Sequence, residues 1–178
     1  FQLRRHLTLA EAEVFVPGLG AGFDGATVLL VTDLHSGPFL SIEACAHTLE
    51  RLAATEPDLI LLGGDFASSG VAELEPHLPA LAGLRAPLGV FAVLGNHDHY
   101  TLEPDRVREA LASHGTRVLH NSAVRLERGG SALLLAGIDD WNIGRPDLGG
   151  AIAQARSLDP SAPILLLSHN PDALFAAE

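Results

Sequence analysis

Several features that mark large classes of protein are absent from this sequence. Its 178 residues include one cysteine, so no disulfide can form within the chain. Lysine and arginine together number 11 against 22 aspartates and glutamates, which gives a net charge of -11. Because binding along a nucleic-acid backbone depends on basic side chains that release counterions, no nucleic-acid scaffold is expected as a partner. No stretch reaches the roughly 18 apolar residues that a membrane span requires.

The usual signals of a complete chain are also missing. The sequence begins at Phe1 and contains no methionine, and the segment 170–178 reads as the opening of a helix without a closing signal. We therefore expect both ends to be cut, leaving one incomplete domain over residues 1–178. No signal peptide is visible, but without the natural start this leaves the localisation open between cytoplasmic and membrane-associated. Contact of the full-length protein with a membrane surface and its oligomeric state are left open as well.

Two catalytic signatures are not found. The chain has neither the glycine-rich loop that cradles nucleotide phosphates nor the strand-turn-helix motif that presents a nucleophilic serine. A covalent enzyme intermediate is therefore not expected.

What is present is the composition of an apolar α/β domain. Hydrophobic residues make up 47% of the chain and the mean hydropathy is +0.24, which suits a single globular core. Apolar runs alternate with amphipathic stretches, which predicts at least one largely parallel sheet and a second sheet or mixed edge near a late hairpin. Strands are expected over 3–16, 27–32, 58–62, 90–94, 118–119, 123–126, 132–136 and 164–167.

Helices are expected between these strands. The first begins at Ser41 and buries one face that includes Cys45. The second covers 71–84, although Pro76 and Pro79 interrupt it. Two more are expected over 104–115 and 148–155, the former with a proline at its first position.

Metal-capable residues follow four of the apolar runs. The runs 28–31, 59–62, 90–94 and 164–167 have the continuous hydrophobicity of parallel strands buried on both faces. In open α/β sheets, ligands bind beyond the carboxyl ends of such strands. The residues found there are Asp33, His35, Asp65, Asn96, His97 and His169.

Each of these residues has a plain alternative explanation when taken alone. Asp33 and His35, two residues apart, can point the same way and hold one cation, or they can cap a turn and lie exposed in a loop. Asp65 follows Gly63 and Gly64, where a ligand can approach the backbone closely. Its two carboxylate oxygens suit a ligand shared by two cations, but an aspartate after glycines is also a common turn residue.

The segment 95–98 is more specific. Asn96 offers a neutral carbonyl oxygen, while His97 can point toward a substrate and be oriented by the carboxylate of Asp98. The alternative is a polar turn. His169 then adds an imidazole at a fourth strand end.

Taken together, these motifs resemble the calcineurin-like metallophosphoesterases. The likeness covers nearly the whole chain and is greatest to the bacterial branch that contains the YkuE- and YaeI-type phosphodiesterases. It is carried by Asp33-x-His35, Gly64-Asp65, Gly95-Asn96-His97-Asp98, Gly137-Ile138-Asp139-Asp140 and Ser168-His169-Asn170-Pro171.

This resemblance implies a fold, a reaction and a set of roles. The fold would be an αββα sandwich of two mixed sheets flanked by helices, truncated at its C-terminal end. The reaction would be metal-dependent hydrolysis of a phosphate ester, most simply a phosphodiester, by a hydroxide that bridges two divalent cations. Mn, Fe or Zn suits the oxygen and nitrogen ligands.

The resemblance also assigns each residue. One cation would take Asp33, His35 and Asp65, and the other Asp65, Asn96 and His169, with Asp65 bridging. His97 would contact the phosphate and assist the leaving group, with Asp98 as its partner. The family's closing Gly-His-x-His motif does not occur before Glu178, so each cation is expected to lack one protein ligand and the 178-residue piece to bind metal incompletely.

The other histidines and two late motifs are open to two interpretations. His99 with Tyr100, the pair His120-Asn121 and the segment 139–141 could face the substrate or serve as loop surface and turns. The remaining histidines are expected on the surface or on helix faces, namely His6, His47, His77 and His114.

Three functions therefore compete. The first is a phosphoesterase whose substrate is a small molecule or a lipid-linked phosphoester. The second is a noncatalytic interaction module that keeps the fold. The third is a protein that binds a single metal.

Overall fold

Two β-sheets form the centre of the molecule. The computed structural model describes residues 8–176. The first sheet is parallel throughout, in the order β1-β2-β3-β4, and its strands are β1 (Val28–Val31), β2 (Leu59–Leu62), β3 (Val90–Ala92) and β4 (Arg117–Val118). The second sheet has the order β5-β6-β7, with β5 (Ser122–Arg128), β6 (Ser131–Gly137) and β7 (Ile164–Leu167).

The connections in the second sheet make it mixed. β5 and β6 form an antiparallel hairpin, and β6 pairs with β7 in parallel. The predicted late hairpin is therefore present, and the predicted arrangement of two sheets between helices is confirmed. Only the second sheet is mixed within the described part of the chain, whereas two mixed sheets were expected.

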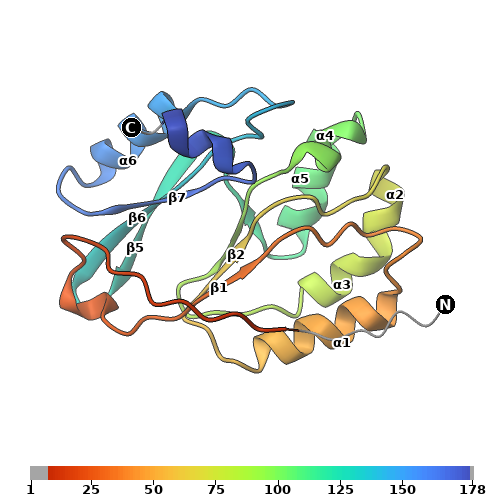
Figure 1. Ribbon diagram of the computed structural model, residues 1–178, viewed down its shortest axis with the longest axis horizontal. Coiled ribbons are helices and arrows are strands. Elements are labelled where there is room, and N and C mark those ends of the chain that lie inside the picture. Colours follow the sequence, from red (N-terminus) through yellow and green to blue (C-terminus); the bar gives the residue numbers. More distant parts are fainter. Residues whose placement is uncertain (1–7, 177–178) are drawn as a thin grey trace.

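Helices cover the outer face of each sheet (Figure 1). The first sheet carries α1, α2, α3 and α5 on its outer side, while α6 lies on the far side of the second sheet. Their bounds are α1 (Ile42–Ala53), α2 (Val71–Leu74), α3 (Leu78–Leu81), α5 (Pro104–Ser113) and α6 (Leu148–Leu158). Shorter elements are α4 (Asn96–Tyr100) and the 3-10 helices η1 (Ala21–Phe23), η2 (Glu75–His77) and η3 (Pro171–Ala176).

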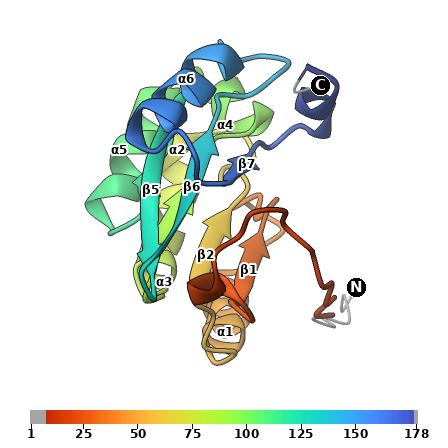
Figure 2. The ribbon, with the colours of Figure 1, turned by 90° about the vertical axis from the view of Figure 1, so that its left-hand side faces the viewer.

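Strand β2 is apolar at every position because both of its faces are covered. Ile60 and Leu62 pack into the core beneath the helices, whereas Leu59 and Leu61 pack between the two sheets. All four side chains are buried. Since successive strand residues point to opposite faces, a strand covered on both sides needs apolar residues at every position. Figure 2 shows the two sheets side by side, with this shared core between them.

The helix α1 forms where the sequence predicts it. The Ser41 side chain accepts a hydrogen bond from the backbone N–H of Ala44 (3.2 Å), which satisfies one of the free donors of the first turn. Cys45 and Leu49 are both 1% exposed on the inner face. The predicted cap and buried face are therefore confirmed.

Two expectations about elements were wrong in part. The strand predicted over 3–16 lies partly outside the described residues, and residues 8–16 form no strand. Val14 and Phe15 are 75% and 89% exposed, so alternation there reflects no buried face. The helix predicted over 71–84 is broken into α2, η2 and α3, because each proline removes a backbone donor from the next turn.

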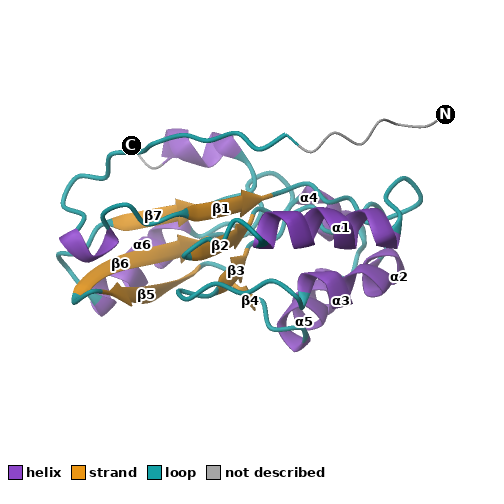
Figure 3. Ribbon diagram, turned by 90° about the horizontal axis from the view of Figure 1, so that it is seen from below, coloured by secondary structure: helices purple, strands orange, loops and turns teal. Residues whose placement is uncertain are grey.

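The parallel strands end at a common edge, which is where their polar residues gather. In Figure 3, β1, β2, β6 and β7 lie in adjacent layers with the helices outside them.

Within residues 8–176, no helix is both long and apolar enough to cross a membrane.

Candidate metal centre

The residues predicted to bind metal all lie just beyond the carboxyl ends of strands. Asp33 and His35 follow β1, Asp65 follows β2, Asn96 opens the helix after β3, and His169 follows β7. The backbone at the first three is unusual. Asp33, His35 and Asp65 have φ of 58°, 45° and 56°, a left-handed conformation that residues with side chains rarely adopt. Such strain is kept where the surroundings fix the chain, which is common at functional sites.

Two glycines let the loops after β2 and β3 touch. Gly64 has φ 99°, and a Cβ on it would lie 2.5 Å from the backbone nitrogen of Gly95. A Cβ on Gly95 would lie 2.2 Å from the carboxylate Oδ1 of Asp65. Neither position has room for a side chain, so both glycines are required to bring Asp65 next to Asn96 and His97.

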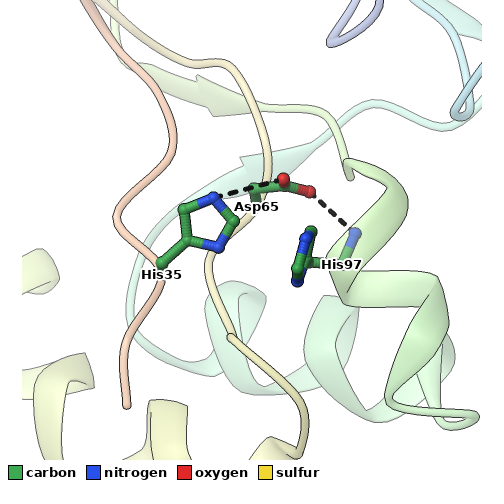
Figure 4. A group of neighbouring side chains, drawn as sticks. All are labelled: His35, Asp65 and His97. Atoms are coloured by element: carbon green, nitrogen blue, oxygen red, sulfur yellow. Dashed lines mark hydrogen bonds and ion pairs between the residues drawn. The ribbon is translucent and has the colours of Figure 1, made fainter. Parts of the chain in front are cut away.

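Asp65 occupies the middle of the site (Figure 4). It is 3% exposed, and its Oδ2 lies 3.5 Å from Nε2 of His35 and 3.5 Å from Nε2 of His169. Its Oδ1 accepts a hydrogen bond from the backbone N–H of His97 (2.8 Å). His35 Nε2 is also 3.5 Å from Oδ1 of Asp33. One buried carboxylate is thus approached by imidazoles from two different loops.

Backbone carbonyls fix the orientation of two of these imidazoles. Nδ1 of His169 lies 2.8 Å from the carbonyl oxygen of Gly63, and Nδ1 of His97 lies 2.8 Å from that of Ser68. A proton on each Nδ1 satisfies the carbonyl and leaves Nε2 as the free nitrogen, as in histidines that bind metals. Nε2 of His169 faces Oδ1 of Asn96 at 3.2 Å.

The donor atoms form two groups that share Asp65. His35, Asp65 and His97 make one group, and Asp33, Asp65 and His169 make the other. In each group the potential ligand atoms lie within 4.8 Å of one another. Asn96 joins the second group through its contact with His169. The structure therefore brings the predicted residues together. Asp33 lies near His35 and also shares a donor group with His169.

Asp98 does not act as predicted. We expected its carboxylate to orient His97, but it is fully buried and accepts hydrogen bonds from four backbone N–H groups instead. Those donors, at 2.9 to 3.1 Å, are Asp65, Phe66, Ala67 and Gly95. Burial raises the pKa of Asp98 to about 6, against the opposing effect of the N–H groups. Through these four hydrogen bonds the carboxylate holds the loops after β2 and β3 together.

A second polar cluster lies beside the centre, in residues whose function the sequence left open. Nε2 of His99 is 2.7 Å from Oδ1 of Asp139, and Nδ1 of His120 is 3.6 Å from the same oxygen. Burial opposes ionisation of Asp139, but the hydrogen bonds from His99 and from the Arg145 N–H hold its pKa well below the ordinary range. The hydrogen bond to Asp139 raises the pKa of His99. Sequence patterns could not reveal this pair, because its members are 40 residues apart.

Other expectations about polar residues are settled individually. Tyr100 is half exposed and its ring lies 5.3 Å from that of His97, so it borders the site. Asp140 accepts hydrogen bonds from the N–H groups of residues 142 and 143, which is the turn role. His77, expected on the surface or on a helix face, lies on η2 but is only 4% exposed, and it contacts the carbonyl oxygens of Glu73 and Leu40. His6 lies outside the described residues.

The donor set fits divalent cations. Carboxylate oxygens, imidazole nitrogens and one amide oxygen converge, and no thiolate is among them. Within residues 8–176, no arginine pairs with Asp33 or Asp65, so these carboxylates have only imidazoles as charged partners. A carboxylate as buried as Asp65 is ordinarily paired with a cation or coordinates one.

Comparisons with known proteins agree with this chemistry. A family model described as calcineurin-like phosphoesterase matches residues 26–173. A Bacillus subtilis protein named uncharacterized metallophosphoesterase YkoQ is 32% identical over 83% of this chain and 54% of its own length. A Danio rerio protein named transmembrane protein with metallophosphoesterase domain is 30% identical over 93% of this chain and 39% of its own length. The chain thus spans roughly half or less of these relatives.

Solved structures share the fold. Haemophilus influenzae NAD nucleotidase matches 85% of this chain and 35% of its own with a TM-score of 0.60 and 14% identity. The phosphopantetheinyl hydrolase of Mycobacterium tuberculosis matches 82% of this chain and 68% of its own with a TM-score of 0.54 and 15% identity. Since the family model matches most of the sequence, the chain belongs to the calcineurin-like phosphoesterase family.

Proposed function

We propose that this chain carries the catalytic centre of a metal-dependent phosphodiesterase that uses two divalent cations. The observation that supports this most directly is that Asp65 belongs to both donor groups. A carboxylate with two oxygens can serve two cations at once, and paired cations about 3.5 to 4 Å apart are the usual device for hydrolysing phosphate esters. The two similar solved structures are named for a nucleotidase and a phosphopantetheinyl hydrolase, in keeping with a phosphoester substrate.

The residues that would hold the cations are Asp33, His35, Asp65, Asn96 and His169. Bound there, Mn, Fe or Zn would supply an activated water and would neutralise charge on the phosphate oxygens. The protein's own contribution is orientation. The carbonyl of Gly63 fixes the ring of His169, and the N–H of His97 fixes one oxygen of Asp65, so that the donors are arranged before an ion arrives.

His97 would act on the leaving group. Its Nδ1–H stays hydrogen-bonded to the carbonyl oxygen of Ser68, so in the charged ring it is the Nε2 proton that is free to pass to the leaving oxygen. The ring stands edge-on to that of His35, with centroids 4.5 Å apart, which keeps it beside the donor group. The ring of Tyr100 also stands edge-on to that of His97, with centroids 5.3 Å apart.

The experiment combines metal binding with hydrolysis of bis-p-nitrophenyl phosphate. Mn titrations and rate measurements are made on this chain and on a version that carries its natural flanking sequence. Asp65→Asn should abolish tight binding of both ions and all Mn-dependent hydrolysis. Asp24→Asn is the matched control, since Asp24 is exposed and precedes β1 at the opposite edge of the sheet.

The two measurements separate the competing functions. Binding of about two ions with hydrolysis that Asp65→Asn removes supports the proposal. Absence of both binding and hydrolysis, in the extended version as well, favours a noncatalytic module. Binding of one ion that Asp65→Asn does not weaken favours a protein with a single metal.

A further inference from the structure

A buried hydrogen bond between two side chains connects the helix α4 to the second sheet. His99 lies on α4, and Asp139 lies just beyond the end of β6. Their side chains are 12% and 3% exposed, and the distance from Nε2 to Oδ1 is 2.7 Å. A hydrogen bond this short, between side chains so removed from water, restrains the two elements more firmly than a contact on an exposed surface.

Asp139 is held firmly on its own side of the contact. Its second oxygen accepts the N–H of Arg145 (2.7 Å), and its own N–H donates to Oδ1 of Asn121 (3.0 Å). Asn121 has φ 49°, and its Nδ2 donates to the carbonyl of Arg145 (2.8 Å). A Cβ on Gly144 would lie 2.6 Å from the Asp139 carboxyl carbon, so the loop is packed closely around it. The carboxylate is therefore a fixed point of the second sheet.

Helix α4 is short and carries two of the residues proposed to act at the metal centre. Its five residues include Asn96 and His97, and its first turn is tied to the first sheet through Asp98. His169, by contrast, comes from β7 of the second sheet, and its Nε2 faces Asn96 at 3.2 Å. The centre is thus divided between the sheets, and the position of α4 relative to the second sheet decides whether Asn96 meets His169.

We propose that His99 and Asp139 are positioning residues that hold α4 at the correct distance from the second sheet. This inference rests on the proposed function, since it concerns the same centre. Neither residue belongs to the donor groups around Asp65. They act through Asn96 and His97, which the pair keeps aligned with His169. Loss of the pair leaves every donor in the chain but lets α4 move away from β7.

The chain offers a matched control for this role. His120 approaches the same oxygen of Asp139, at 3.6 Å, but it lies between β4 and β5 and is 41% exposed. Removing this imidazole takes one neighbour away from Asp139 without releasing α4. His99→Ala and His120→Ala therefore differ in the one property that the proposal concerns.

The test measures three quantities in the wild type and in both variants. These are the Mn dissociation constant, kcat and KM for bis-p-nitrophenyl phosphate, and amide hydrogen exchange of α4 without metal. His99→Ala should weaken Mn binding on the order of tenfold, as substitutions beside a ligand shell do, and lower kcat with KM changed less than about threefold. Exchange in α4 should quicken by about tenfold. His120→Ala should stay within about twofold on every readout.

Conservative variants keep the test decisive. His99→Gln retains a donor that reaches Asp139 and should recover most of the affinity and the slow exchange. If His99→Ala does not fold, His99→Asn fills much of the space with an amide too short for the contact, and the same losses are expected of it. Wild-type Mn affinity and exchange in a folded His99→Ala, or equal losses in His120→Ala, would overturn the proposal.

Failure of the proposed function is recognisable separately. A wild type that binds no Mn contradicts the metal centre, whereas exchange in α4 still reports on the pair. Unchanged exchange in His99→Ala would then reject the positioning role by itself.

Discussion

At the scale of single residues, the centre depends on glycines that leave room for the ligands as well as on the ligands themselves. Gly95 faces Asp65 so closely that any side chain would overlap the carboxylate. Asp98 adds a second constraint, because one carboxylate gathers four N–H groups from two loops. Local sequence could show that this segment was unusual, but it could not show that Asp98 faces the backbone of residues 65–67 rather than His97.

Gly95→Ala tests the close approach. The new methyl group would lie 2.2 Å from Asp65 Oδ1 and must displace it. We expect Mn affinity to fall by more than tenfold and the free energy of unfolding to fall by about 1–3 kcal/mol, as overpacking does. Isothermal titration and urea unfolding measure both. Gly70→Ala, where nothing lies within 4 Å of the added Cβ, should change the affinity very little.

His97→Ala separates catalysis from metal binding. If His97 delivers a proton to the leaving oxygen, kcat should fall by about 10²–10⁴ with the bound metal unchanged. Metal analysis of the purified variant beside its rate with bis-p-nitrophenyl phosphate gives the answer. Loss of one ion per chain would instead make His97 a ligand, as its grouping with His35 and Asp65 permits.

At the scale of elements, local signals explain most of what forms. Ser41 starts α1, Pro104 starts α5 and Asp147 caps α6 by accepting the N–H of Gly150 (2.8 Å). The strand predicted over 3–16 was wrong in its described part. Alternating hydrophobicity predicts that one face of a segment is apolar, but it does not show that another element packs against that face. Pairing partners decide whether such a segment becomes a strand, and they are distant in sequence.

Asp159 makes the end of α6 sensitive to acid. The N–H and hydroxyl of Ser161 and the N–H of Ala162 bind its carboxylate and lower its pKa to about 2. A lowered carboxyl pKa stabilises the fold above the unfolded value of about 4, and that contribution disappears as the pH falls toward 2. The difference in unfolding free energy between wild type and Asp159→Asn should be constant from pH 7 to 5 and shrink below pH 4.

Denaturant unfolding at a series of pH values measures this difference. Glu50→Gln, an exposed change on α1, is a suitable control for general effects of charge. A difference that grows on acidification would contradict the assignment.

At the scale of the whole molecule, the predicted α/β class and family are confirmed. The four apolar runs ending in metal-capable residues were enough to predict the common edge, because parallel strands place their carboxyl ends together. They could not predict how the donors divide around Asp65, since that depends on how the second sheet packs against the first. For the same reason the sequence could not predict the contact between His99 and Asp139, which connects α4 to the second sheet.

Metal should stabilise the whole fold if the centre is assembled as proposed. An ion that binds only the native state at 100 times its dissociation constant adds about 2.7 kcal/mol to the free energy of unfolding. For a domain of this size we expect Tm to rise by roughly 5–10 °C. Differential scanning calorimetry with Mn and with a chelator gives the shift. Asp65→Asn should show almost none, and a shift equal to the wild type would place the ions elsewhere.

The division of the donors between the two sheets has a consequence during synthesis. A growing chain releases Asp33, Asp65 and Asn96 early, but His169 emerges only after β7 has been made. Until then the partners of Asp65 are incomplete, and an ion held by them could leave readily. If the centre assembles as proposed, a cation cannot bind to Asp65, Asn96 and His169 together until β7 has been synthesised.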